Sequence, residues 1–105
     1  MNARENNRAS IDTQPYELVD LAAIIRSHRW TICEAYFYGG YQAALEAVAH
    51  ASIDLCGWVR SRSLTAPAAF DPLQEVSENL GLVRHFGQDA VQSAIVAGVK
   101  LWSAP

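Results

Sequence analysis

Three ionisable side chains lie at helical spacing near the middle of the chain. Glu46, His50 and Asp54 are each four residues apart, so on a helix they share one face. A carboxylate–imidazole–carboxylate row can transfer protons. The same row is typical of the solvated face of an amphipathic helix, which is the interpretation we favour. A polar contact to a partner is the second interpretation and catalysis the third.

No other residues complete a site for chemistry. His28, His50 and His85 are widely separated, and Cys33 and Cys56 form no C-x-x-C pair, so we predict neither a metal nor a cofactor. The sequence contains no G-x-S-x-G motif and no glycine-rich phosphate loop. We therefore predict that the protein is not an enzyme. Both cysteines lie in apolar helical patterns, where we expect the reduced thiols typical of the cytoplasm.

Aromatic residues gather around a pair of glycines. Tyr36, Phe37, Tyr38 and Tyr41 surround a helix and cannot all point into one core. We expect two or three to pack inside and one or two to be partly exposed. Exposed tyrosines and tryptophans are typical of protein-binding surfaces. The residues that we predict to bind a partner are Tyr36, Tyr38, Tyr41, Glu46, His50, Asp54 and Trp102.

Two C-terminal features allow other interpretations. Residues 75–82 resemble the first helix and turn of a DNA-binding helix-turn-helix, and residues 90–95 resemble its recognition helix. Residues 83–89 are longer than the compact turn allows, and the second helix is mostly apolar. A DNA-binding regulator is therefore an alternative function. Ala90, Ala94 and Gly98 form a ridge of small residues that can seat a helix of the same bundle or, with Trp102, a second copy.

Length and charge restrict the class of protein. The chain has 105 residues, is 50% hydrophobic and carries a net charge of −3, which suits one domain with one core. This charge disfavours nucleic acid as the main partner. The polar first ten residues resemble no signal peptide, and no apolar run is long enough for a membrane span.

The hydrophobic spacing places these residues on helices. After a disordered tail over residues 1–11, residues 12–15 predict a helix start, and residues 27–29 predict its end. Thr31 and Glu34 form a capping box after Trp30, which predicts a second start. At Gly39 and Gly40 we favour a kink or continuation over a break.

The second half predicts a central helix and then shorter ones. Residues 41–63 carry a long stripe of apolar and small residues, typical of the central helix of a bundle. Residues 65–70 predict a loop, Asp71 and Pro72 a helix start, and Gly81 its end. Residues 82–86 form a short segment, and residues 88–102 predict a last helix. The fold class is therefore all-α, a single compact bundle of four or five helices over residues 12–105.

Part of this pattern resembles a known family. Residues 41–56 (YQAALEAVAHASIDLC), a loop with Pro67 and residues 70–76 (FDPLQEV) are similar to the middle of HepT-like members of the HEPN superfamily. The resemblance covers about residues 41–100 and implies an all-α fold, dimerisation through helices and a toxin–antitoxin or defence context. The family's ribonuclease motif is an Arg followed by a His. Lys100 stands at the matching position with no His after it, so no catalytic residue carries over.

We predict a non-enzymatic protein–protein interaction module. It would bury a helical, aromatic surface on a protein partner or in a homodimer. The small size and the lack of motifs suit a cytoplasmic regulator or inhibitor of a larger bacterial or phage assembly. A HEPN-like toxin–antitoxin component or ribonuclease is the alternative, and the helix-turn-helix regulator is the second alternative.

Overall fold

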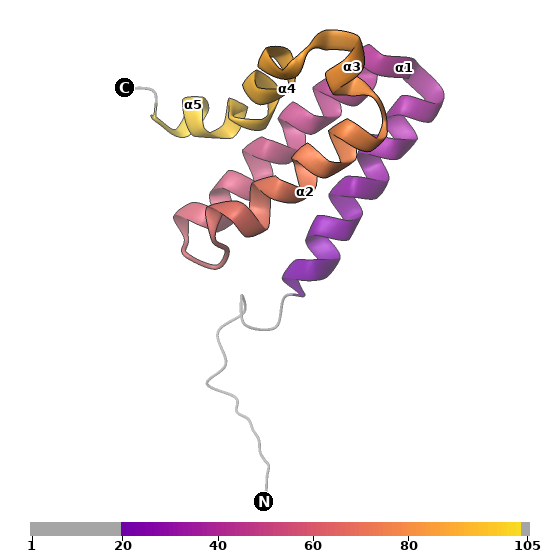
Figure 1. Cartoon of the computed structure of the whole chain (residues 1–105). Helices are drawn as coiled ribbons and strands as arrows, with labels where there is room; N and C mark the ends of the chain where they lie inside the picture. The colour runs from indigo at the N-terminus through magenta and orange to yellow at the C-terminus, as the bar shows by residue number, and fades with distance from the viewer. Residues whose placement is uncertain (1–19, 104–105) are drawn as a thin grey trace, which may run out of the picture.

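One long helix opens the described part of the chain and folds back on itself. This computed structural model describes residues 20–103, which contain five helices and no strand. The helices are α1 (Leu21–Arg60), α2 (Ala66–Asn79), α3 (Leu82–Phe86), α4 (Gln88–Ile95) and α5 (Ala97–Ser103), as Figure 1 shows. The predicted all-α fold class is confirmed. The predicted tail at residues 1–11 and the helix start at 12–15 lie outside the described residues.

The long helix begins at an aspartate. The side chain of Asp20 accepts a hydrogen bond from the amide of Ala23 at 3.1 Å, which satisfies one of the free amides of the first turn. The predicted end at residues 27–29 and the second start at Thr31 are wrong, because α1 continues through both. Ile32 is fully buried in the core, so a helix that continues here buries an apolar side chain.

Gly40 reverses the direction of α1. A straight helix of 40 residues would be about 60 Å long, whereas Figure 1 shows two antiparallel arms side by side. Gly40 has φ 80° and ψ −162°, a conformation that is almost restricted to glycine. The kink is thus sharp enough to make a hairpin. We call residues 21–39 the first arm and residues 41–60 the second arm.

The second helix begins earlier than its sequence pattern predicted. The hydroxyl of Thr65 accepts a hydrogen bond from the amide of Ala68 at 3.3 Å, and Pro67 lies in the first turn. The predicted loop at residues 65–70 and the helix start at Asp71 are therefore wrong, and Pro72 lies inside α2. Thr65 and Pro67 form a start signal of the same kind one and a half turns earlier, and the earlier start buries Ala69.

Glycines divide the C-terminal region into short helices. Gly81 and Gly87 have φ of 84° and 94° and bound α3 on its two sides, as their positions predicted. The predicted continuous helix over residues 88–102 is wrong, because α4 ends before Val96 and α5 begins at Ala97. The hydroxyl of Ser52 on the second arm contacts this break. It donates to the carbonyl of Ile95 and accepts from the amide of Gly98 at 3.0 Å.

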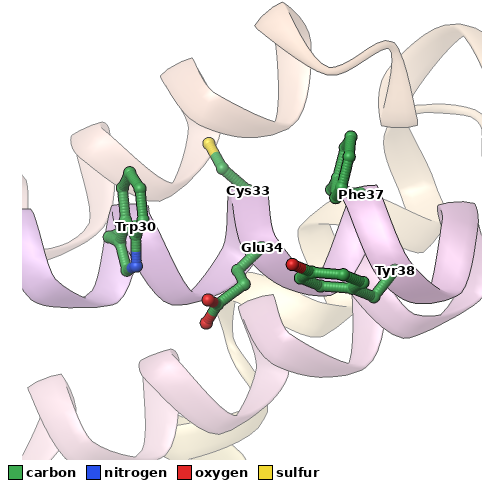
Figure 2. A pocket seen from close by; sticks show the side chains of 5 residues that line it. All are labelled: Trp30, Cys33, Glu34, Phe37 and Tyr38. Atoms are coloured by element: carbon green, nitrogen blue, oxygen red, sulfur yellow. The ribbon is translucent and has the colours of Figure 1, made fainter.

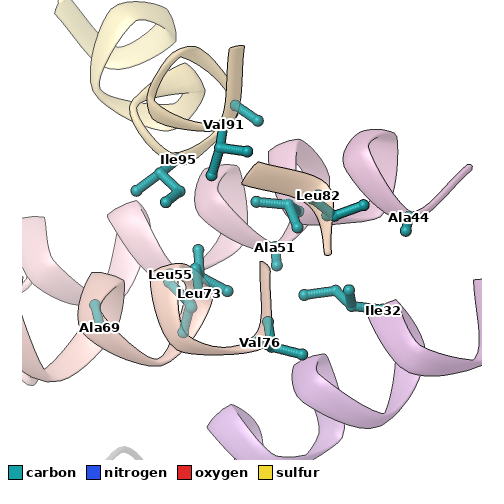
Figure 3. Close-up of a cluster of buried hydrophobic side chains, with 12 residues drawn as sticks. Ile32, Ala44, Ala51, Leu55, Ala69, Leu73, Val76, Leu82, Val91 and Ile95 are labelled. Atoms are coloured by element: carbon teal, nitrogen blue, oxygen red, sulfur yellow. The ribbon is translucent and has the colours of Figure 1, made fainter. Parts of the chain in front are cut away.

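The core lies between the two arms of α1 and the shorter helices. The predicted stripe of the second arm faces this core, with Val48, Ser52 and Leu55 fully buried. Figure 3 shows how side chains from α1, α2, α3 and α4 meet there. The residues that form this cluster are Ile32, Ala44, Val48, Ala51, Leu55, Ala69, Leu73, Val76, Leu82, Val91, Ala94 and Ile95.

Candidate functional site

The aromatic cluster divides between the inside and the outside of the bundle. Tyr36 is half-buried and packs against the core, whereas Phe37 and Tyr38 are 77% and 79% exposed. The exposed rings contact each other edge to face, with centroids 4.9 Å apart. Residues 37 and 38 lie about one turn after Glu34. They therefore extend a surface that begins nearer the N-terminal end of the first arm.

A continuous apolar and charged strip runs along the outside of the first arm. Figure 2 shows Trp30, Cys33 and Phe37 in a row, with Glu34 and Tyr38 beside them. These five residues line a shallow hollow of about 300 Å³. A second hollow of about 390 Å³ shares two of them and extends toward the start of the arm. We call this strip the outer face, and its residues are Arg26, Arg29, Trp30, Cys33, Glu34, Phe37 and Tyr38.

Helical spacing explains why these residues share a face. Residues 26, 30, 33 and 37 are separated by steps of four, three and four, which keeps them on one side of a helix. The other side of the same arm carries Ile25, Ile32 and Tyr36, which pack into the core. The first arm therefore has two apolar sides, and the bundle described here covers one of them.

Charges border the outer face. Arg26 lies 3.7 Å from Asp20, and Arg29 lies 3.5 Å from Glu75 on α2. Both pairs are largely exposed, so each contributes little to stability. Within residues 20–103, the side chain of Glu34 makes no hydrogen bond or ion pair. The face therefore has arginines toward its N-terminal end and, near its middle, a carboxylate that no other residue of the described range pairs with.

Tyr36 and Tyr41, both predicted to bind a partner, contact each other, and Tyr41 remains 37% exposed while it packs on α3. Their rings lie edge to face with centroids 5.3 Å apart, and Tyr41 also stacks on His85 with centroids 4.1 Å apart. A hydrogen bond with the Tyr41 side chain, and then the charge of Tyr41, raise the pKa of Tyr36. These two tyrosines join the hairpin to α3, and Tyr38 is the tyrosine that the outer face presents.

Glu46, His50 and Asp54 are all exposed on the second arm. Glu46 accepts a hydrogen bond from Gln42 at 3.1 Å, while Asp54 pairs with His28 of the first arm at 2.7 Å. Among the described residues, no hydrogen bond joins His50 to either carboxylate. The structure thus places Asp54 in a contact between the two arms instead of in a three-residue relay.

Other predicted features take up places in the bundle. Val91, Ala94 and Ile95, on the segment that resembles a recognition helix, are buried in the core. Gly98 is also buried against the second arm, while the side chain of Trp102 lies outside the described residues. Cys33 is exposed and Cys56 is buried, and both are free thiols.

Two further properties apply to the described part of the chain. Over residues 20–103, no group of three His, Cys, Asp or Glu side chains is placed to hold a metal ion. In the same range, no helix combines the length and the hydropathy that crossing a membrane requires.

The sequence pattern missed most of the outer face. The capping box at Thr31 predicts a helix boundary at Trp30, whereas Trp30 lies inside a continuous helix. The available signal was the spacing of Trp30, Cys33 and Phe37, which forms a second apolar stripe beside the one through Ile25 and Ile32. Comparison with protein-family models, curated proteins and solved structures finds no match to this chain.

Proposed function

We propose that this chain is a non-enzymatic interaction module that binds a protein through the outer face of the first arm. The observation that supports this proposal is the exposure of three large aromatic side chains on one helix face. Trp30, Phe37 and Tyr38 are 70%, 77% and 79% exposed. Single exposed apolar residues are ordinary, whereas a contiguous apolar patch with a polar border is typical of a protein-binding site.

The residue types suit this function. Tryptophan, tyrosine and arginine dominate the binding energy of protein interfaces, and the outer face contains all three. Transfer of each aromatic side chain from water into an interface contributes about 2 kcal/mol. The surrounding charges would form the polar rim that a binding patch requires.

The wider role is a proposal of the same kind. A module of this size, with one binding face, suits a cytoplasmic regulator or inhibitor that acts by occupying a surface of a larger bacterial or phage assembly. The two free cysteines fit a reducing compartment. Such a role needs no chemistry from this chain, only affinity and shape.

Replacement of the outer-face aromatics tests the proposal. We expect the variant with both Trp30→Ala and Phe37→Ala to lose its protein partner when tagged chain is purified from native cells at near-native abundance. Leu101→Ala is the matched control, because Leu101 is an exposed apolar residue on α5, away from the outer face. Equal recovery of the same stoichiometric partner by all three folded proteins would contradict the proposal.

A further inference from the structure

We infer that α5 is a hinged cover over the buried thiol of Cys56, and that it opens while the rest of the bundle stays folded. The structure holds the closed form, in which Cys56 is 5% exposed. Opening of α5 uncovers the side of Cys56 that faces it and so controls access to this thiol. The inference does not depend on the proposed function, because α5 packs on the second arm and the outer face lies on the first.

The backbone of α5 rests directly on the second arm. A Cβ placed on Gly98 would lie 2.8 Å from the Cβ of Cys56 and 2.5 Å from the carbonyl oxygen of Ser52. These distances leave no room for a side chain at Gly98, so this contact is a close approach of two helix backbones. Gly98 therefore supplies part of the cover over Cys56.

The described side chains of α5 bury little apolar surface. Among residues 97–101, Gly98 alone is buried, and it has no side chain. Val99 and Leu101 are 43% and 57% exposed, and no residue of this range belongs to the core cluster. Burial of apolar surface is the main favourable term in packing one element on another. These residues therefore hold α5 weakly on the second arm.

A hydrogen bond closes the contact. The amide of Gly98 donates to the hydroxyl of Ser52 at 3.0 Å. One bond between neutral groups contributes modestly, because water replaces it when the two groups separate. A helix as short as α5, which covers Ala97–Ser103, also gains little stability from its own hydrogen bonds. Its position thus depends on a small contact with the second arm.

The break before α5 provides the hinge. Helix α4 ends at Ile95, and Val96 leaves the helical conformation before α5 begins. The core side chains of this region, Val91, Ala94 and Ile95, all belong to α4. Figure 1 shows α5 beyond α4 at the edge of the bundle. Rotation at Val96 can therefore move α5 while α4 keeps its place in the core.

The urea dependence of thiol labelling tests whether α5 opens separately. Maleimide labelling of Cys56 in the full chain is followed by mass spectrometry at rising urea concentration, and circular dichroism measures global unfolding. Separate opening exposes little surface, so we expect a labelling rate that hardly changes at low urea. We also expect this rate to exceed the rate that global unfolding allows by about tenfold or more.

Three variants locate the opening at α5. We expect Gly98→Ala to raise the labelling rate without urea about tenfold or more, because the added Cβ does not fit under the closed helix. Gly57→Ala is the matched control beside Cys56, since a Cβ there meets nothing within 4 Å, and it should not raise the rate. Ile32→Val weakens the core at the first arm, so it should lower global stability and leave this rate unchanged.

The opposite results would overturn the inference. If labelling of Cys56 follows global unfolding at every urea concentration, α5 does not open separately from the bundle. If Gly98→Ala leaves the rate unchanged, or Ile32→Val raises it equally, the thiol becomes accessible by some other motion. If Gly98→Ala fails to fold, the urea dependence of the wild-type chain and the rate of the Ile32 variant still decide the question.

Discussion

A single buried hydroxyl connects the second arm to the C-terminal helices. Ser52 is fully buried, and its hydroxyl donates to the carbonyl of Ile95 and accepts from the amide of Gly98. The break between α4 and α5 leaves these two backbone groups without helical partners. Buried backbone groups need such partners, because each one without a hydrogen bond lowers stability. The hydroxyl therefore replaces the missing helical bonds of this break.

Removal of that hydroxyl should destabilise the fold. We expect Ser52→Ala to lower the free energy of unfolding by about 1–3 kcal/mol, because it leaves two buried backbone groups unpaired. Urea denaturation followed by circular dichroism measures the change. Ser93→Ala on the exposed side of α4 is the control, with little expected effect. Equal stability of the Ser52 and Ser93 variants would contradict this account.

Replacement of glycine by alanine should lower stability at one position and raise it at another. A Cβ at Gly98 would lie 2.5 Å from the carbonyl oxygen of Ser52, so Gly98→Ala should cost about 1–3 kcal/mol through overpacking. A Cβ at Gly57 meets nothing within 4 Å, and alanine favours the helix, so Gly57→Ala should add about 0.5–1 kcal/mol. Thermal unfolding of both variants tests this. The prediction fails if both changes have the same sign.

At the scale of elements, the hairpin depends on one backbone conformation. Gly40 lies in a region of φ and ψ that side chains other than glycine's rarely enter. We expect Gly40→Ala to lower the free energy of unfolding by about 1–3 kcal/mol through backbone strain, even though a Cβ there meets no neighbour. Denaturant titration measures this loss. A variant as stable as the wild type would show that the arms do not need this turn.

Local signals predicted the helical content better than the helix ends. The apolar spacing of the second arm, and the glycines at residues 81 and 87, were sufficient to place helices and turns correctly. The capping box at Thr31 and the start at Asp71 were wrong, because a local cap is worth only about 1 kcal/mol. Burial of Ile32 and Ala69 in continuous helices outweighs it.

The candidate site was harder to predict for a related reason. Tyr38 was among the predicted residues, but Trp30 and Phe37 belong to the outer face only because the first arm is unbroken. Spacing alone shows that a helix has two apolar sides. Which side the bundle covers depends on the reversal at Gly40, and that is a tertiary property.

At the scale of the whole molecule, one residue of the first arm should matter for partner binding and another for stability. Phe37→Ala removes an exposed ring, so the free energy of unfolding should change by less than about 0.5 kcal/mol, while recovery of the protein partner from native cells falls about tenfold or more. Ile32→Ala opens the core and should cost about 2–5 kcal/mol. Denaturation of both variants, and purification of each from native cells, test this difference. A large loss of stability in the Phe37 variant would contradict it.

The reactivity of one thiol tests most directly whether the outer face is covered by protein. Cys33 lies on that face and is exposed, whereas Cys56 is buried and serves as the internal reference. Maleimide labelling, followed by mass spectrometry, compares purified chain with intact native cells. We predict that Cys33 reacts rapidly in the purified chain and slowly in native cells, while Cys56 reacts slowly in both. Equally rapid labelling of Cys33 in the purified chain and in native cells would contradict the central claim that this face binds a protein.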